Sequence, residues 1–349
     1  MSDLPSPFPR RRVVVFVANA DSQDIAVLAL DDASGKLSEV ERFAVGGTVM
    51  PLAVSPDRSV LYASIRLAPF RVQSLAIDAA SGRLTEIGSA PLPASMCWIS
   101  TDPSGRFLLS ASYGSSVVAV SPIAADGVAQ AAQQTVATEA NAHSIQVDPS
   151  NCFAFAACLG GGVIRQMRFD AASGRLDAND PPAWHARPGA GPRHFVFHPT
   201  LALVYLLNEL DATIDVLELD RERGTLKGGR PFVSALPPDF AAGAPWAADL
   251  HLTPDGRFLF ASERRSSTLA AFAIDAAGGA LTPLGSTPTE AEPRGFAITP
   301  DGRFLIAVGQ ASNRLSLYAI DPKTGALTKR GEQAVGANPN WVEIVELPA

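Results

Sequence analysis

Basic side chains stand in the same place in two similar stretches of this sequence. Arg193 lies in GPRHFVFHP (191–199) and Arg294 in EPRGFAITP (292–300), each directly before an apolar run typical of a buried strand. His194 follows the first arginine. A guanidinium binds carboxylate or phosphate through a planar fork, and an imidazole moves a proton near neutral pH. These residue types predict a site for a small anionic molecule, with proton transfer or activated water as its chemistry.

Motifs of several other chemistries are missing from the sequence. It contains no GxSxG elbow, Ser/His/Asp order, glycine-rich phosphate loop, HExxH or calcium-type carboxylate cluster. Cys97, Cys152 and Cys158 include no CxxC pair, so we expect neither a disulfide framework nor structural zinc, and a reducing compartment fits. We therefore expect a reaction without a covalent nucleophile, a metal or a cofactor.

Composition limits the class of protein. The 349 residues are 47% hydrophobic and 18% charged, with a net charge of −7, which predicts a large core and argues against nucleic-acid partners. No apolar stretch reaches the roughly 20 residues that span a membrane. The segment PRRRVVVFVANA (9–20) superficially resembles a secretion signal, but its short, valine-rich run is more typical of a strand. We expect a cytoplasmic protein that is a monomer or a weak homodimer.

An internal repeat predicts the architecture. An Asp, a short spacer, Gly, any residue and Leu recur, with one degenerate copy, and the seven glycines lie 45 to 55 residues apart. They are Gly35, Gly82, Gly127, Gly174, Gly224, Gly279 and Gly325. Between these motifs, apolar runs flank a turn that contains a proline, which is typical of β-hairpins. The turn prolines are Pro56, Pro103, Pro149, Pro199, Pro254 and Pro300.

Four strands in each repeat of roughly 45 residues are typical of a propeller blade. We predict an all-β, seven-bladed β-propeller with four antiparallel strands in each blade. Only six hairpins are visible, so NWVEIVEL (340–347) should pair with VVVFVAN (13–19) and close the ring in one blade. The expected domain covers residues 13–349, after a flexible tail of residues 1–12.

The repeat register brings polar residues together at one mouth of the central channel. The first strand of a blade normally lines the channel, and in an antiparallel hairpin its start lies beside the end of the second strand. Counted from the turn prolines, nine polar residues fall at these two places or directly beside them. They are His143, Arg193, His194, Asp249 and Arg294 at strand starts, and Arg66, Tyr113, Glu209 and Arg264 at strand ends.

Each of these residues also has a simpler interpretation. Arg193 or Arg294 can be solvated at a strand start, and Glu209 can be a loop carboxylate or a partner that only neutralises an arginine. His143 can cap a strand end, His194 can act behind the site, and Asp249 can hold a turn. His198 and His251 fall within strands, where we expect structural roles. The convergence of nine residues in one register favours a site over these alternatives.

Several strings resemble the family of propeller-type bacterial 6-phosphogluconolactonases, which is related to fungal carboxymuconate lactonizing enzymes. They include MPLAVSPDRSVLYASIR (50–66), GPRHFVFHP, WAADLHLTPDGRFLFA (246–261), EPRGFAITPDGRFLIAVGQ (292–310) and VGANPNWV (335–342). The resemblance covers residues 13–349 nearly end to end. The tail is longer than in the family, and SYGSS (112–116) is looser than the family's loop.

The resemblance implies hydrolysis of 6-phosphoglucono-δ-lactone to 6-phosphogluconate in the oxidative pentose phosphate pathway. It implies catalytic roles for His143, Arg193, Glu209 and Arg294. The arginines would bind phosphate or polarise the lactone carbonyl, and His143 would activate water, with Glu209 orienting or charging it. Arg66, His194, Asp249, Arg264 and Tyr113 would bind substrate.

Two rival functions remain on the same frame. One is a lactonase or carboxymuconate-type cycloisomerase that acts on another anionic lactone. The other is a non-catalytic interaction scaffold, because a fold does not fix a function. Arg66 and Arg264 favour a phosphate-bearing substrate, and the polar residues at the channel mouth favour an enzyme over a scaffold.

Overall fold

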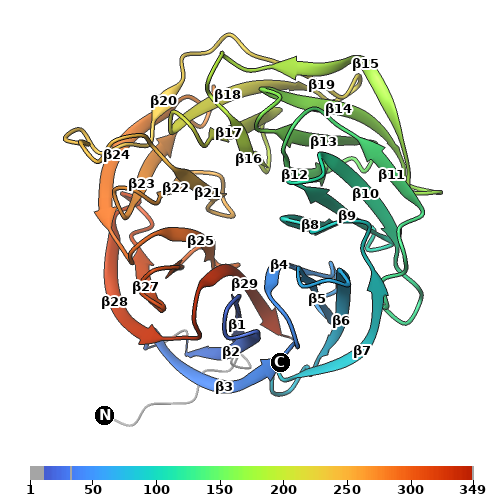
Figure 1. The fold of residues 1–349 in the computed structure, drawn as a ribbon. Helices are drawn as coiled ribbons and strands as arrows, with labels where there is room; N and C mark the ends of the chain where they lie inside the picture. The colour runs from blue at the N-terminus through green and yellow to red at the C-terminus, as the bar shows by residue number, and fades with distance from the viewer. Residues whose placement is uncertain (1–11, 32–33, 348–349) are drawn as a thin grey trace.

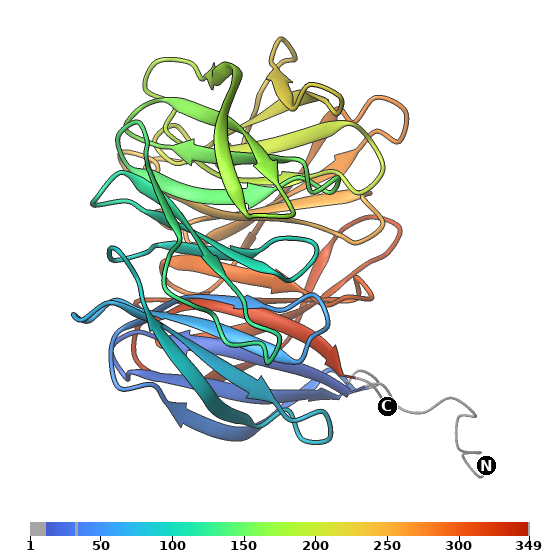
Figure 2. The same cartoon turned by 90° about the vertical axis from the view of Figure 1, so that its right-hand side faces the viewer.

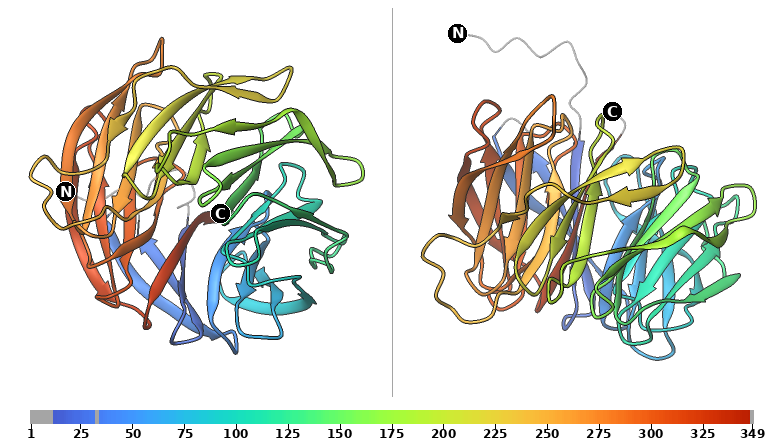
Figure 3. Two further views of the ribbon diagram at one scale, coloured as in Figure 1. Left: turned by 45° about the horizontal axis from the view of Figure 1, so that its top comes forward. Right: turned by 90° about the horizontal axis from the view of Figure 1, so that it is seen from above.

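Seven antiparallel sheets surround a central channel in the computed structural model, which describes residues 12–31 and 34–347 (Figure 1). The other views show the connecting loops gathered on the two faces of the ring (Figures 2 and 3). The predicted all-β propeller is confirmed. Among the described residues, no helix is long and apolar enough to cross a membrane.

Each blade runs from an inner strand at the channel to an outer strand at the rim. The closing blade contains β29 (Pro339–Leu347), β1 (Arg12–Asn19), β2 (Asp24–Asp31) and β3 (Lys36–Ala44). The next blade contains β4 (Val49–Val54), β5 (Val60–Ile65), β6 (Arg71–Ile77) and β7 (Leu84–Pro91). The third contains β8 (Trp98–Thr101), β9 (Phe107–Ser112), β10 (Val117–Pro122) and β11 (Gln134–Ala137). The fourth contains β12 (Ala142–Val147), β13 (Phe153–Cys158), β14 (Val163–Asp170) and β15 (Arg175–His185).

The remaining three blades follow the same plan, and one of them carries an additional short strand. The fifth contains β16 (Pro192–Phe197), β17 (Leu203–Asn208), β18 (Thr213–Asp220) and β19 (Thr225–Lys227), and β20 (Val233–Ser234) also pairs with β18. The sixth contains β21 (Ala247–Leu252), β22 (Phe258–Glu263), β23 (Thr268–Ile274) and β24 (Leu281–Pro288). The seventh contains β25 (Pro293–Ile298), β26 (Phe304–Gly309), β27 (Arg314–Ile320) and β28 (Leu327–Ala334).

The two ends of the chain close the ring as the repeat predicts. β1 pairs with β29 on one side and with β2 on the other, and Val15 lies opposite Ile344 in the first of these ladders. β1 begins at Arg12, one residue before the expected start of the domain. The expected tail otherwise falls on residues 1–11, which lie outside the described residues.

Blade packing explains why the strands read as near-continuous apolar runs. Seven apolar clusters fill the seven spaces between neighbouring blades, so the middle strands are covered on both faces. β1 shows this directly, since Val13 to Ala18 are all buried. A strand buried on both faces loses the usual alternation of apolar and polar residues.

Glycines of the repeat occupy the turn between the third and fourth strands of each blade. All seven have positive φ, from 62° at Gly224 to 84° at Gly127. A residue with a Cβ is strained in this left-handed conformation, which explains why glycine recurs at this position. In the copies that begin with Asp, the glycine N–H donates to the aspartate carbonyl, as Gly82 does to Asp78 at 2.7 Å.

Candidate active site

Bulges at the starts of the inner strands aim the site residues into the channel mouth. The pairing register shifts between Ala142 and Ser144, between Pro192 and His194, and between Pro293 and Gly295. His143, Arg193 and Arg294 are therefore the extra residues of three bulges. A bulge re-aims a side chain and interrupts the strict alternation of faces. It allows consecutive residues, such as Arg193 and His194, to serve one region.

Glu209 joins two buried arginines at the mouth. Its Oε2 accepts from Arg193 Nε at 2.6 Å and from Arg264 Nη2 at 3.2 Å. The side chains of both arginines are 1% exposed. The solvated alternative is therefore wrong for Arg193. Such burial is tolerated only because the guanidinium groups have a shared counter-ion and further acceptors.

Trp246 supports the second of these arginines. The guanidinium of Arg264 lies 3.7 Å from the centroid of the Trp246 ring, and Arg264 also donates to the carbonyl oxygens of Trp246 and Ala247. Burial, with Arg193 and Arg294 nearby, lowers the pKa of Arg264 to about 8. The cluster therefore carries more positive charge than one carboxylate offsets.

Arg294 provides a cation that no other described side chain neutralises. No hydrogen bond or ion pair joins its guanidinium to the described part of the chain. Burial and the neighbouring Arg193 lower its pKa to about 10, so it stays charged at neutral pH. Arg66 is nearly as free, because within the described part of the chain its side chain donates only from Nε, to Ser95 Oγ at 2.8 Å. Free donors of this kind suit a doubly charged oxyanion.

A pocket of about 550 Å³ adjoins Arg294 at the mouth. Besides Arg294 and Trp246, it is lined mainly by polar residues: Asp21, Glu292, Gln310, Asn313 and Asn338. Gln310 Nε2 donates to Asn338 Oδ1 at 2.7 Å, which holds the two amides in place. Amide groups beside a cation suit a polyol that bears a negative charge.

His143 is the buried titratable group with the fewest partners at this site. It is 5% exposed, and its Nδ1 has no hydrogen-bond partner among the described residues. Burial and the charge of Arg193 hold its pKa well below the ordinary value. The Tyr113 ring lies 5.8 Å away, centroid to centroid, and Tyr113 itself is 38% exposed at the rim. His143 is thus a neutral base with a free lone pair or N–H.

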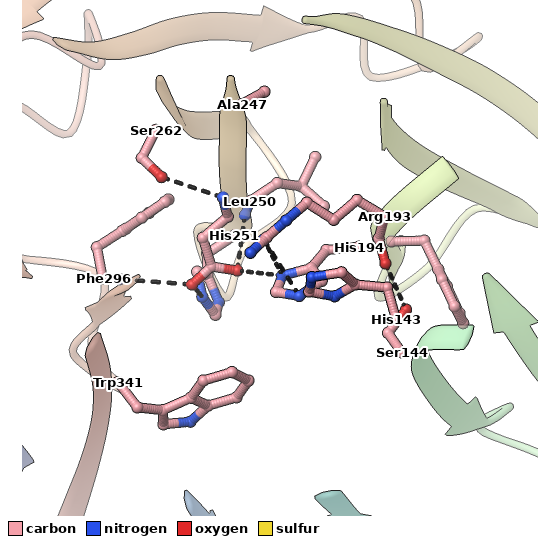
Figure 4. Close-up of polar contacts among 12 residues, drawn as sticks. His143, Ser144, Arg193, His194, Ala247, Leu250, His251, Ser262, Phe296 and Trp341 are labelled. Carbon is pink, nitrogen blue, oxygen red and sulfur yellow. Dashed lines mark hydrogen bonds and ion pairs between the residues drawn. The ribbon is translucent and has the colours of Figure 1, made fainter. Parts of the chain in front are cut away.

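His194 lies beside His143 (Figure 4), and Asp249 contacts His194 in turn. The His143 and His194 rings are 5.0 Å apart, and His194 Nδ1 lies 2.9 Å from Asp249 Oδ1. The second oxygen of Asp249 lies 3.2 Å from His251 Nε2. Asp249 therefore lies within β21, and its carboxylate holds two imidazoles in place. The alternative in which Asp249 stabilises a turn is wrong.

Aromatic rings separate this mouth from a chamber deeper in the channel. The Trp98 ring lies 4.7 Å from the His194 ring and 5.3 Å from the Trp341 ring, and we call these three rings the partition. Below it lies a cavity of about 280 Å³, which we call the chamber. Its polar lining comprises Ser100, Thr101, Gln146, His194, Asp249, His251 and Glu343.

Two residues that line the chamber, Glu343 and His251, were not predicted from the sequence as site residues. Trp341 Nε1 donates to Glu343 Oε1 at 2.9 Å, and burial raises the pKa of Glu343 to about 7. The repeat could have identified both residues. His251 lies three residues before the turn proline Pro254, and Glu343 occupies the equivalent position in the closing blade. Ser100 and Gln146 fill the same slot and also line the chamber.

Most of the predicted site residues come together in the structure. His143, Arg193, His194, Glu209, Asp249 and Arg264 form one connected group, and Arg294 lies beside it. Tyr113 and Arg66 lie farther out on the rim. Among the described residues, no three His, Cys, Asp or Glu side chains are grouped so as to hold a metal ion.

Fold and site together define a seven-bladed propeller with a cationic site at one channel mouth. A family model described as "Lactonase, 7-bladed beta-propeller" matches residues 13–344. The chain belongs to this lactonase family.

Individual relatives extend this result. The chain is 42% identical over 285 residues to a 6-phosphogluconolactonase of Pectobacterium carotovorum, covering 82% of this chain and 84% of the relative. It is 41% identical to the 6-phosphogluconolactonase of Serratia proteamaculans over the same shares. A periplasmic gluconolactonase of Pseudomonas aeruginosa has a similar structure, with a TM-score of 0.90 and 28% identity over 97% of this chain and all of that one.

Proposed function

We propose that this protein hydrolyses 6-phospho-D-glucono-1,5-lactone to 6-phospho-D-gluconate at the channel mouth. The observation that carries the proposal is the unpaired Arg294 guanidinium beside two arginines that already share Glu209. A phosphate would give Arg294 the counter-ion that it lacks. The names of the bacterial relatives support this substrate.

His143 is the proposed general base. Its Nδ1 is buried and has no hydrogen-bond partner among the described residues, which leaves Nε2 as the ring nitrogen that would meet a water molecule. The base takes a proton from water as the water oxygen attacks the lactone carbonyl carbon. The protonated imidazole then gives that proton to the ring oxygen as its bond to the carbonyl carbon breaks. The product acid ionises at neutral pH, so each turnover releases one proton.

Arg193 is the proposed electrophilic group. A fixed, buried cation stabilises the oxyanion that forms when water adds to the carbonyl. Glu209 holds Arg193 through Nε and the His194 ring faces Nη1, which leaves Nη2 for the substrate. In this arrangement Glu209 orients Arg193 and Arg264 rather than His143, because its side-chain contacts go to the two arginines.

The phosphate would lie between Arg294 and Arg66, and the hydroxyl groups of the sugar would face the amides of Gln310, Asn313 and Asn338. His194 and Asp249 act from behind the site in this proposal. The reaction belongs to the oxidative branch of the pentose phosphate pathway. We accordingly propose a cytoplasmic enzyme, monomeric or weakly dimeric.

A lactone without phosphate is the second candidate substrate. Asp21 and Glu292 line the same pocket as Arg294, and carboxylates accept hydrogen bonds from sugar hydroxyls but repel phosphate. The similar Pseudomonas protein is named a gluconolactonase.

One experiment separates these candidates. Freshly generated 6-phosphogluconolactone and gluconolactone are offered to the wild type and to Arg294→Gln, and hydrolysis is measured above the spontaneous rate. We expect wild-type acceleration with the phosphorylated lactone. Arg294→Gln should raise KM for that lactone by about tenfold or more, since a charge-assisted contact contributes roughly 1.5–3 kcal/mol.

Arg223→Gln is the matched control, because Arg223 lies exposed in the turn between β18 and β19. It should leave both substrates unaffected. No acceleration with either lactone would contradict the lactonase proposal. An equal loss on both lactones would show that Arg294 does not bind the phosphate.

A further inference from the structure

Asp249 uses its two carboxylate oxygens on two different imidazoles. Oδ1 lies 2.9 Å from His194 Nδ1, at the partition, and Oδ2 lies 3.2 Å from His251 Nε2, in the chamber. Figure 4 shows His194 and His251 near each other at this site. A carboxylate only accepts hydrogen bonds, so both of these ring nitrogens must carry hydrogen.

We propose that His251 is a positioning residue for the mouth: as a cation on the second oxygen of Asp249, it keeps His194 neutral, with its hydrogen on Nδ1. The proposal rests on the lactonase function for its catalytic meaning. The charge coupling itself rests only on the geometry of Asp249 and the two histidines.

The backbone fixes Asp249 between the two rings. Leu250 N–H donates to Oδ1 at 3.0 Å, and Phe296 N–H lies 3.4 Å from Oδ2. The N–H of Asp249 itself donates to Ser262 Oγ at 3.0 Å. These contacts come from β21, β22 and β25, so the carboxylate cannot turn toward one histidine without losing the other.

His194 stands among cations. Arg193 Nη1 lies 3.3 Å from His194 Nε2 and 3.4 Å from Nδ1, and these near-equal distances place the guanidinium over the face of the ring. The charge of Arg294 also lowers the pKa of His194, and the His143 and His194 rings pack edge to face. A proton on His194 would therefore face Arg193 directly. Burial and Arg193 lower the pKa of His194 to about 3, despite the neighbouring Asp249.

His251 faces two carboxyl groups, Asp249, which is ionised, and Glu343, which ionises only near its raised pKa of about 7. Asp249 faces it from its own strand and Glu343 from β29, while the Phe296 ring packs 4.8 Å away, centroid to centroid. Burial alone would lower the pKa of His251, but Asp249 and Glu343 raise it above the ordinary value. Of the two histidines, His251, on the chamber side of Asp249, is therefore the one that carries the additional proton and the positive charge.

This arrangement explains why the carboxylate needs two partners. A lone carboxylate beside an imidazole stabilises the protonated ring, as in a catalytic triad. A cation on its other oxygen offsets that effect. A neutral His194 then supports Arg193 across its face, which keeps the guanidinium aimed at the substrate and not repelled from the ring.

Nuclear magnetic resonance of the histidine rings tests the charge coupling without any substrate. The five histidines are assigned by single substitutions, and the ring nitrogen shifts of the wild type are followed against pH. We expect His194 to remain neutral, with hydrogen on Nδ1, throughout pH 5–8, and His251 to titrate above its ordinary value. A charged His194 or its other tautomer at pH 7 would overturn the proposal, and so would a neutral His251 at pH 6.

His251→Gln then removes the charge but keeps an N–H to reach Asp249 Oδ2. The titration is extended below pH 5 to reach the low pKa of His194, which should rise by about one unit or more because Asp249 loses its second counter-ion. The matched control is His185→Gln, at an exposed position at the end of β15, which should leave His194 unchanged. An unchanged His194 in folded His251→Gln would contradict the coupling.

The pH dependence of kcat/KM tests the link to catalysis. The acidic limb should move upward by about one pH unit in His251→Gln and stay in place in His185→Gln, a change that simple loss of packing does not produce. A moved His194 titration with an unmoved pH profile would overturn the positioning role. Absence of lactonase activity in the wild type would instead contradict the proposed function, while the resonance measurements would still decide the coupling.

Discussion

The mouth and the chamber belong to one channel, yet they have opposite chemistry. The mouth gathers the positive charge of Arg193, Arg264, Arg294 and Arg66, and Arg193 and Arg264 share the carboxylate of Glu209. The chamber contains Asp249, Glu343 and His251 and no arginine in its lining. The rings of Trp98, His194 and Trp341, which line the chamber, pack against one another between them.

Position along the inner strands explains this contrast. Residues at the same register position of different blades lie at the same level of the channel, so each level is lined by side chains from several blades. The mouth level begins at the bulges, and the chamber level lies three residues farther along the same strands. A propeller can thus place opposite charges a few residues apart without pairing them, provided that packed side chains keep them out of contact.

The largest expected effect comes from removing the shared carboxylate of the mouth. Glu209→Gln leaves Arg193 and Arg264 buried without a counter-ion. We expect a loss of about 3 kcal/mol or more in the free energy of unfolding, measured in urea, because breaking a buried pair strands a charge. The catalytic rate should fall by about a hundredfold or more, because Arg193 loses its orientation. A stable and active variant would show that the arginines do not depend on Glu209.

His143→Asn should separate chemistry from stability within the mouth. We expect kcat to fall by about a hundredfold or more with little change in KM, the scale of a lost general base. Stability should change by only about 1 kcal/mol, because Nδ1 has no partner to lose. His185→Asn is the control, at an exposed position. Steady-state kinetics and urea unfolding check both parts, and unaffected kinetics would remove His143 from the mechanism.

The smallest expected effect comes from changing Glu343 in the chamber, and it is a gain in stability rather than a loss. Glu343 has a pKa of about 7 in the folded protein, above the ordinary 4.5. The folded state therefore holds a proton that the unfolded state releases, and wild-type stability falls as pH rises through this window. Glu343→Gln keeps the acceptor for Trp341 and removes the charge. We expect it to be more stable than the wild type by about 1 kcal/mol at pH 8 and equal to it near pH 4. Urea unfolding at both pH values measures this, and a loss at pH 8 would contradict the contrast with Glu209→Gln.

The sequence by itself determined the ring and its closure. Gly82 and its six equivalents are required by positive φ in a recurring turn, and such local requirements are visible in a one-dimensional pattern. The same register placed Arg193, Arg294 and His143 at one mouth, because antiparallel hairpins fix which strand ends meet.

Only the tertiary structure decided how these side chains are paired. Glu209 binds Arg193 and Arg264 and leaves Arg294 free. This pairing depends on distances between different blades. The role of His251 also became visible only in the structure. Its sequence position indicated a strand, but its environment comes from Asp249 and Glu343, more than 90 residues apart in the sequence. Burial and the neighbouring charges set the protonation of a histidine, and both arise when distant strands close around one channel.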